Sequence, residues 1–171
     1  EEAKIIALTD LKKYLVHDKT FLYVDVGGGS TELTIYSKEK SVLSKSFKIG
    51  TVRLINELVP DSIWKQMKLW IKEHTKKYNQ ITLLGTGGNI NSTYKFSGTK
   101  LGKPLSYHYL KKYFRTVESF SYEERISKLN MNLDRADVIL PALNIYISAM
   151  QWSGAKEIYV PKIGLSDGII R

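Results

Sequence analysis

Three consecutive glycines, residues 27–29, restrict the fold of this chain more than any other feature of its sequence. Residues 21–26 before them form a short, mostly apolar stretch typical of a buried strand, and residues 32–36 after them alternate as a second strand does. Glycines in a row break any regular element, so the chain must turn between the two strands. The sequence therefore predicts a hairpin that carries a glycine turn.

The pattern beyond this hairpin predicts the fold class. A third strand over residues 41–49 follows a turn at 37–40, and strands then alternate with helices. The sequence predicts helices over residues 3–16, 51–58, 62–78, 107–114, 122–129, 133–152 and 165–170, and strands over residues 81–84 and 157–160. The result is an α/β fold with a mixed five-stranded sheet of order β-β-β-α-β-α-β-α and packed helices. This order is typical of one lobe of the ribonuclease-H-like (actin-like ATPase) fold, and we interpret residues 1–171 as a single domain.

Composition excludes several classes of protein. The chain has 171 residues, 43% hydrophobic and 25% charged, as in an ordinary globular domain. It has no cysteine, which excludes disulfides, thiol catalysis and cysteine-based zinc sites. No apolar run approaches the roughly 18 residues that a membrane span needs. The net charge of +9 suits a polyanionic partner such as polyphosphate, nucleic acid or a membrane surface, or else a lysine-rich solubilising surface.

The glycine turn is flanked by residue types that bind phosphate and divalent cations. The candidate residues are Asp25, Gly27, Gly28, Gly29, Ser30, Thr31 and Glu32. Glycine has no Cβ, so backbone N–H groups of the turn can approach a phosphate closely, and the two hydroxyls add donors. The two carboxylates can hold a divalent cation or a water. The alternative is a tight glycine-rich hairpin that binds nothing.

A second glycine loop, Gly85-Thr86-Gly87-Gly88, follows the strand predicted at residues 81–84. A helix is expected to begin nearby, and helix N-termini bind anions through their unpaired N–H groups. The loop lacks the Lys-Ser/Thr of a Walker A loop, so by itself it is a weak signal. Because both glycine loops follow strands, we expect them to share one edge of the sheet and to face one anionic ligand.

Six short motifs, taken in order, resemble those of the Ppx/GppA phosphatase family of exopolyphosphatases and guanosine pentaphosphate phosphohydrolases. They are residues 1–4 (EEAK), 25–32 (DVGGGSTE), 50–54 (GTVRL), 85–88 (GTGG), 135–139 (RADVI) and 164–168 (GLSDG). The resemblance spans nearly the whole chain. It implies that residues 1–171 are the second, C-terminal lobe of the phosphatase core, without the N-terminal lobe of the same protein. Because the chain begins with Glu1 rather than Met, we expect a fragment that holds half a site and is inactive alone.

The resemblance also implies a role for the matching residues. Glu2 matches the catalytic glutamate, a general base that orients a water for attack on the terminal phosphorus. Asp25 and Glu32 match acidic residues of the same centre, which bind Mg²⁺ or another divalent cation. Gly27 and Ser30 match phosphate-contacting positions, and so does the second glycine loop. The implied enzyme is bacterial and cytoplasmic, acts in the stringent response on polyphosphate or guanosine pentaphosphate, and is commonly a homodimer.

Several alternatives stay open. The chain could be an ATPase or sugar-kinase-like lobe of the same superfold, or a non-catalytic polyanion-binding module. Arg53 could contact a phosphate or lie on a helix surface, and Arg135 is expected to form a structural ion pair with Asp137. Asn89 stands where family members more often carry threonine. The tyrosines and lysines of residues 107–114 favour a half-buried helix with snorkelling lysines over a nucleic-acid surface.

Overall fold

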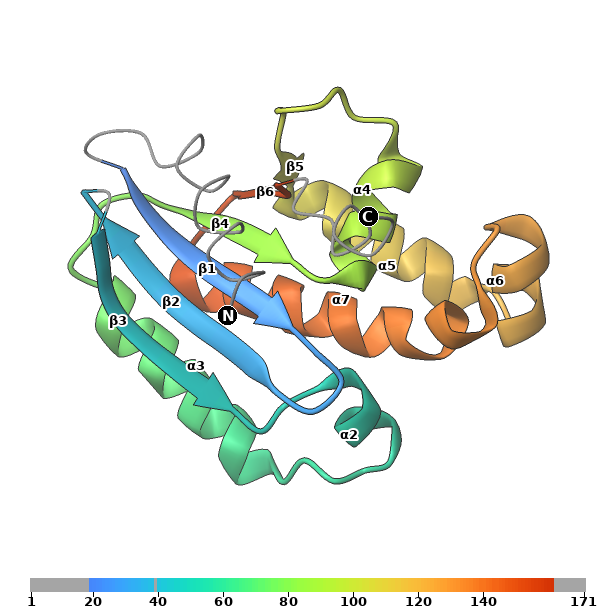
Figure 1. Cartoon of the computed structure of the whole chain (residues 1–171), viewed down its shortest axis with the longest axis horizontal. Coiled ribbons are helices and arrows are strands. Elements are labelled where there is room, and N and C mark those ends of the chain that lie inside the picture. The colour runs from blue at the N-terminus through green and yellow to red at the C-terminus, as the bar shows by residue number, and fades with distance from the viewer. Residues whose placement is uncertain (1–18, 39, 162–171) are drawn as a thin grey trace, which may run out of the picture.

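The computed structural model describes residues 19–38 and 40–161, in which a six-stranded sheet packs against a layer of helices (Figure 1). In chain order the elements are β1 (Thr20–Val26), β2 (Thr31–Ser37), β3 (Lys40–Phe47), α2 (Thr51–Ile55), α3 (Asp61–Thr75), β4 (Ile81–Thr86), α4 (Gly88–Ser97), β5 (Leu105–Ser106), α5 (Tyr107–Ser119), α6 (Tyr122–Lys128), α7 (Leu133–Ser153) and β6 (Glu157–Tyr159). Glu2, the helices predicted at 3–16 and 165–170, and the motif at 164–168 lie outside the described residues.

The strands lie in the order β3-β2-β1-β4-β6-β5. The first three strands form antiparallel hairpins, whereas β4 pairs in parallel with β1 and with β6. The mixed sheet that the sequence predicts is therefore confirmed. The sixth strand, β5, has two residues and pairs antiparallel with β6, and so short a segment leaves no periodic pattern in a sequence.

The position of each strand in the sheet explains its composition. The strand β1 lies between β2 and β4, and most of its side chains are buried. The edge strand β3 is exposed along its length except at Phe47. It carries Lys40 and Lys45, and charged side chains on an edge strand discourage pairing with another chain. A register shift between Ile35 and Tyr36 adds a bulge to the β2–β3 pair.

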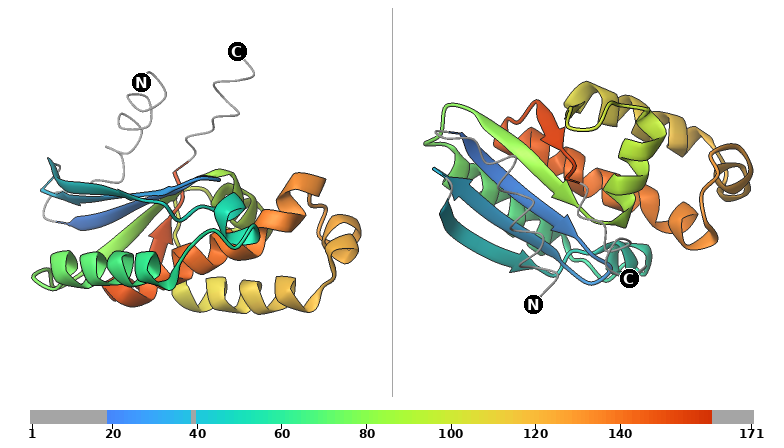
Figure 2. Two further views of the ribbon diagram at one scale, coloured as in Figure 1. Left: turned by 90° about the horizontal axis from the view of Figure 1, so that it is seen from below. Right: turned by 45° about the horizontal axis from the view of Figure 1, so that its top comes forward.

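One face of the sheet is covered by α3, α5 and α7, as Figure 2 shows. The helix α7 lies at the centre of this layer and contacts α2, α3, α4, α5 and α6. Its buried residues are Ala136, Ile139, Ala142, Leu143, Ile145, Tyr146, Ala149 and Met150. The prediction of a buried core helix over residues 133–152 is confirmed. None of the helices in the described part of the chain is long and apolar enough to span a membrane.

The opposite face of the sheet carries a smaller aromatic cluster. Phe21, Tyr36 and Leu84 are buried there, with Tyr23 and Tyr159 packed against them. Because side chains alternate between faces along a strand, residues 21, 23 and 25 of β1 share this second face. The fold therefore places the Asp25 carboxylate on the face away from the helical layer, at the end of β1.

Candidate active site

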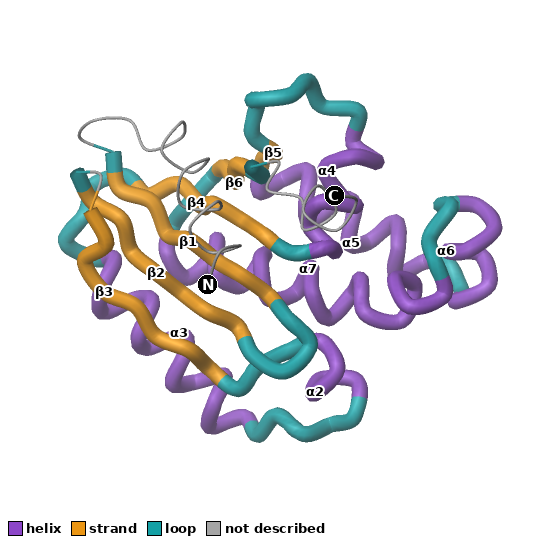
Figure 3. Tube along the Cα trace, viewed as in Figure 1, coloured by secondary structure: helices purple, strands orange, loops and turns teal. Residues whose placement is uncertain are grey.

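The two glycine loops meet at one edge of the sheet, as the sequence predicts. The strands β1 and β4 are parallel neighbours, with Asp25 in register with Thr86. Parallel strands end at the same edge, so the turn after β1 and the junction between β4 and α4 lie close together (Figure 3). We call residues 27–30 the first glycine loop and keep the name second glycine loop for residues 85–88.

The first glycine loop is held by the short helix α2 that follows β3. The carbonyls of Gly27 and Gly28 each accept a hydrogen bond at 3.0 Å from an N–H group of the first two residues of α2. The carbonyl of Gly29 accepts from Nε of Arg53 at 2.7 Å. Three successive carbonyls of the loop therefore point toward α2.

This arrangement fixes the direction of three N–H groups. No peptide bond in the described residues is cis, and in a trans peptide the C=O and the N–H point in opposite directions. The N–H groups of Gly28, Gly29 and Ser30 consequently point away from α2. Within residues 19–38 and 40–161, none of the three has a hydrogen-bond partner. Successive N–H groups that point to one side form an anion-binding concavity.

Gly50, the residue before α2, allows this close approach. A Cβ at this position would overlap the carbonyl group of Gly28, so any other residue would push α2 away from the loop. The contact is also tight at Gly28, where an added Cβ would lie 3.2 Å from Cγ2 of Val52. The motif at residues 50–54 thus has a physical function, which is to support the first glycine loop.

A row of polar side chains crosses three strands beside the first glycine loop. Asp25 is the cross-strand partner of Glu32 on one side and is in register with Thr86 on the other. Burial raises the pKa of Asp25; the nearby Thr86 hydroxyl partly opposes this, and the Glu32 charge adds to it. The Thr86 hydroxyl donates its one proton to the Tyr23 hydroxyl at 2.9 Å, and burial raises the pKa of Tyr23 to about 12. Asp25 is therefore a half-buried carboxyl with a second carboxyl next to it.

These two carboxyls fit a divalent cation. Paired residues on antiparallel strands have Cβ atoms about 5 Å apart, so the Asp25 and Glu32 side chains can reach one ion. Mg²⁺ is commonly bound by one or two carboxylates together with phosphate oxygens and water. The described residues contain no group of three or more metal-ligating side chains, so a cation held by Asp25 and Glu32 would take its other ligands from phosphate oxygens and water.

The second glycine loop opens α4. Gly87 precedes the helix with φ +127°, a conformation that favours glycine. The first turn of α4 has no side-chain cap, which leaves its N-terminal N–H groups available for an anion. Next to it, the amide oxygen of Asn89 is buried and has no hydrogen-bond partner in the described part of the chain. A ligand or water that donates to this oxygen would satisfy it.

Arg135 is a candidate site residue that sequence reasoning missed. Its guanidinium lies against Gly88, where an added Cβ would be 2.6 Å from Nη2 and 2.9 Å from Nη1. No ion pair between Arg135 and Asp137 occurs among the described residues, so the expected structural pair is not formed. A guanidinium at the start of α4 adds positive charge and a fork of donors for a phosphate. Only its place in the motif at 135–139 could have indicated this position.

Two predicted phosphate-binding residues have structural contacts. The Thr31 hydroxyl is buried and donates to the Ile49 carbonyl at 2.6 Å, which fastens β2 to the segment before α2. Gly85 is buried within β4, and a Cβ there would lie 2.6 Å from Cδ1 of Ile158. The structure does not bring these two residues to the open side of the loops. It does bring together Asp25, Gly27, Gly28, Gly29, Ser30, Glu32, Arg53, Thr86, Gly87 and Gly88.

A mixed sheet with three leading antiparallel strands, and two glycine loops at the ends of β1 and β4, defines a lobe of the actin-like ATPase fold. The family model described as the Ppx/GppA phosphatase family matches residues 1–171, and the chain belongs to that family. A search of curated protein sequences gives no match.

Solved structures of the same fold include members of this family. An exopolyphosphatase from Cytophaga hutchinsonii superposes with a TM-score of 0.74 at 20% identity, and the match covers 99% of this chain and 61% of that one. The Aquifex aeolicus member of the Ppx/GppA family superposes with a TM-score of 0.70 at 24% identity and covers 99% and 61%. The chain therefore spans about three fifths of the length of these structures, and it shares their fold over nearly all of its own.

Proposed function

We propose that the protein is a phosphohydrolase that removes the terminal phosphate from inorganic polyphosphate or guanosine pentaphosphate. The observation that carries the proposal is the first glycine loop, whose three N–H groups point away from α2 beside the Asp25–Glu32 pair. Such a loop suits a phosphate, and the adjacent carboxyls suit a cation that accompanies it. Membership of the Ppx/GppA phosphatase family supports the same conclusion.

The chain's own residues suggest how the reaction proceeds. The terminal phosphate lies against the N–H groups of the first glycine loop, and the rest of the phosphate chain extends toward Arg135 and the start of α4. Glu2 accepts a proton from a water whose oxygen attacks the terminal phosphorus. The bond from phosphorus to the bridging oxygen breaks, and the bridging oxygen stays on the shortened chain. The products are orthophosphate and a chain one phosphate shorter. Mg²⁺ bound by Asp25 and Glu32 would offset negative charge on the phosphate oxygens.

The same proposal extends to partners and setting. The second face of the cleft would come from an N-terminal lobe of the same protein, and the enzyme would be a cytoplasmic homodimer. The fragment alone would then hold half a site and be inactive. The net charge of +9 favours a polyanionic substrate, and we expect neither nucleic acid nor membrane to be the partner.

Phosphate release tests this proposal directly. The full-length protein that contains this chain is incubated with Mg²⁺ and long-chain polyphosphate, guanosine pentaphosphate or ATP, beside its Glu2→Gln variant and the 171-residue chain. We expect release from a phosphate-chain substrate that falls about 10³-fold in Glu2→Gln. The matched control, Glu1→Gln, keeps the activity. Release from ATP alone would instead indicate an ATPase lobe, and no release from any of the three would indicate a binding module.

A further inference from the structure

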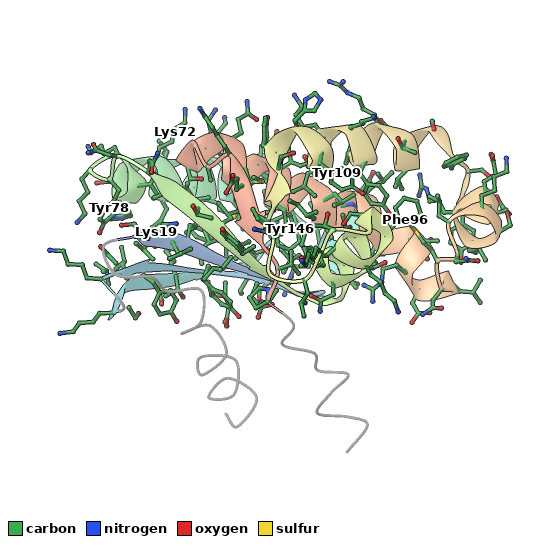
Figure 4. The ribbon with its side chains drawn as sticks, turned by 90° about the horizontal axis from the view of Figure 1, so that it is seen from above. Lys19, Lys72, Tyr78, Phe96, Tyr109 and Tyr146 are labelled. Carbon is green, nitrogen blue, oxygen red and sulfur yellow. The ribbon has the colours of Figure 1, made fainter. Side chains whose placement is uncertain are left out.

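Tyr146 is a fully buried residue in the middle of α7, with no solvent exposure. Figure 4 shows it between the helical layer and the sheet. Its ring is part of the main core, but its hydroxyl reaches the edge of the sheet where both glycine loops lie. A tyrosine in this place thus connects the core helix with the candidate site.

The Tyr146 hydroxyl meets the ends of both central strands. It donates a hydrogen bond to the carbonyl of Thr86, the last residue of β4. A Cβ added to Gly87 would lie 3.0 Å from the Tyr146 hydroxyl and also 3.0 Å from the carbonyl oxygen of Val26, the last residue of β1. The hydroxyl, the start of the second glycine loop and the end of β1 therefore converge on one point.

The bond to Thr86 sets the direction of the next N–H group. The peptide between Thr86 and Gly87 is trans, so a carbonyl held toward α7 turns the Gly87 N–H away from α7. The positive φ of Gly87 then leads directly into α4. The first glycine loop is oriented by the same geometry, with α2 in place of the tyrosine.

We propose that Tyr146 is a positioning residue for the second glycine loop, whose hydroxyl holds the Thr86 carbonyl and thereby orients Gly87 and the start of α4 relative to Asp25. It contacts no reacting atom and acts through the Thr86 main chain. The inference rests on the proposed function only for its catalytic consequence, because the orientation of the loop is a property of the fold.

The chemistry of the buried hydroxyl supports a positioning role. A phenylalanine would fill the same space in the core, and a buried hydroxyl is unfavourable unless it is hydrogen bonded. Burial, and then the nearby Asp25 charge, keep the pKa of Tyr146 well above its ordinary value, so the hydroxyl stays protonated and remains a donor. The hydroxyl therefore adds little to packing and serves the contact with Thr86.

The test compares Tyr146→Phe with Tyr113→Phe in the full-length protein. Tyr113 is a matched control, since it is buried in α5 against Phe96 and Tyr109, near the C-terminal end of α4. Amide hydrogen exchange at Asn91, whose N–H donates to the Gly87 carbonyl at 3.1 Å, is measured by NMR and reports the loop without any need for activity. Titration with pyrophosphate and the kcat and KM for phosphate release report its use.

We expect exchange at Asn91 to become about tenfold faster in Tyr146→Phe, with pyrophosphate binding and kcat/KM each about tenfold lower. Tyr113→Phe should leave all three as in the wild type. Equal effects of the two variants on exchange at Asn91, or no effect of either, would mean that Tyr146 is only a packing residue. If the wild type releases no phosphate, the proposed function fails, while the exchange comparison still decides the role of Tyr146.

Discussion

The two glycine loops are oriented in the same way but by different parts of the chain. The first glycine loop has three carbonyls bound by α2, whose residues begin about two dozen positions further along the sequence. The second has one carbonyl bound by a hydroxyl 60 residues away. Three contacts from one helix are redundant, whereas a single side chain is not. We therefore expect the first loop to tolerate the loss of one contact and the second to be sensitive.

The loops also differ in charge. The first lies beside two carboxyls, Asp25 and Glu32, and the second beside the guanidinium of Arg135. A phosphate chain with a divalent cation at one end complements both, because the cation offsets the carboxyls and the arginine meets the more distant phosphates. This difference suggests that the cation and the reacting phosphate belong to the first loop and the remainder of the chain to the second.

Asp25→Asn should have the largest effect, because it removes the charge that distinguishes the first loop. Phosphate release should fall about 10³-fold. With EDTA present, the variant should be more stable than the wild type at pH 7. Burial raises the pKa of Asp25 in the folded protein, so the folded wild type binds the Asp25 proton more tightly than the unfolded chain does. The wild type therefore loses stability as the pH rises from the ordinary pKa of aspartate through the raised one.

Urea unfolding at several pH values checks the second half of this prediction. The stability advantage of Asp25→Asn should shrink as the pH falls toward roughly 4, the ordinary range of aspartate. Glu73→Gln, on the exposed side of α3, is the control and should show neither effect. A variant that loses activity but is destabilised at pH 7 would mean that Asp25 is favourably ionised in the fold.

Glycine-to-alanine substitutions test the main-chain packing that supports each loop. Gly50→Ala should be destabilised by about 3 kcal/mol, since its Cβ meets the main chain of the first loop. That is a Tm lower by roughly 6–12 °C. Gly87→Ala, strained at φ +127° and close to Tyr146, should lose about 2 kcal/mol. Thermal unfolding measures both.

Gly98→Ala separates strain from contact in this series. Gly98 also has positive φ, but nothing lies within 4 Å of an added Cβ. It should therefore lose about 1 kcal/mol, the cost of the backbone conformation alone. If Gly87→Ala lost no more stability than Gly98→Ala, the close contacts at the second loop would not contribute to the free energy of unfolding.

Arg135→Ala tests the charge beside the second loop. We expect KM for the phosphate-chain substrate to rise about tenfold with little change in Tm, because the residue is half-exposed and lies against Gly88. Arg135→Lys should recover part of the affinity, since it keeps the charge without the fork of donors. If Arg135→Ala and Asp137→Asn lowered Tm equally and left KM unchanged, the two residues would form a structural ion pair instead.

The fold follows from local patterns, so much of it can be predicted from the sequence. The glycine turn after residues 21–26 predicts a hairpin, and the apolar run from 133 to 152 predicts a core helix. Both predictions succeed because each pattern lies within one continuous stretch of sequence. That the two loops share an edge also follows, since both come after strands. A helix was expected to begin near the second glycine loop, as α4 does, but the extent of α4 and the strand β5 were missed because they lie in a stretch without clear periodicity.

The support of the loops depends on which distant residues meet, and a single sequence does not reveal this. Nothing about Tyr146 differs from other apolar positions of α7 until its hydroxyl is seen against Thr86. The need for glycine at position 50 likewise appears only when the Gly28 carbonyl is placed beside it. The residue types near the site can therefore be predicted from the sequence, whereas the orientation of their side chains and main chain can be determined only from the structure.

Arg53→Ala should have the smallest effect and most directly tests redundancy at the first loop. The variant loses the bond to the Gly29 carbonyl but keeps the three backbone bonds from α2 to the carbonyls of Gly27 and Gly28. We expect kcat/KM to fall about threefold, which corresponds to well under 1 kcal/mol. Arg53→Lys, which keeps the charge but not the Nε donor, should behave like Arg53→Ala if the bond to Gly29 is what matters. A loss of 10²-fold or more that lysine rescues would mean that Arg53 contacts the phosphate itself, and the first loop would then depend on a single charge as the second depends on a single hydroxyl.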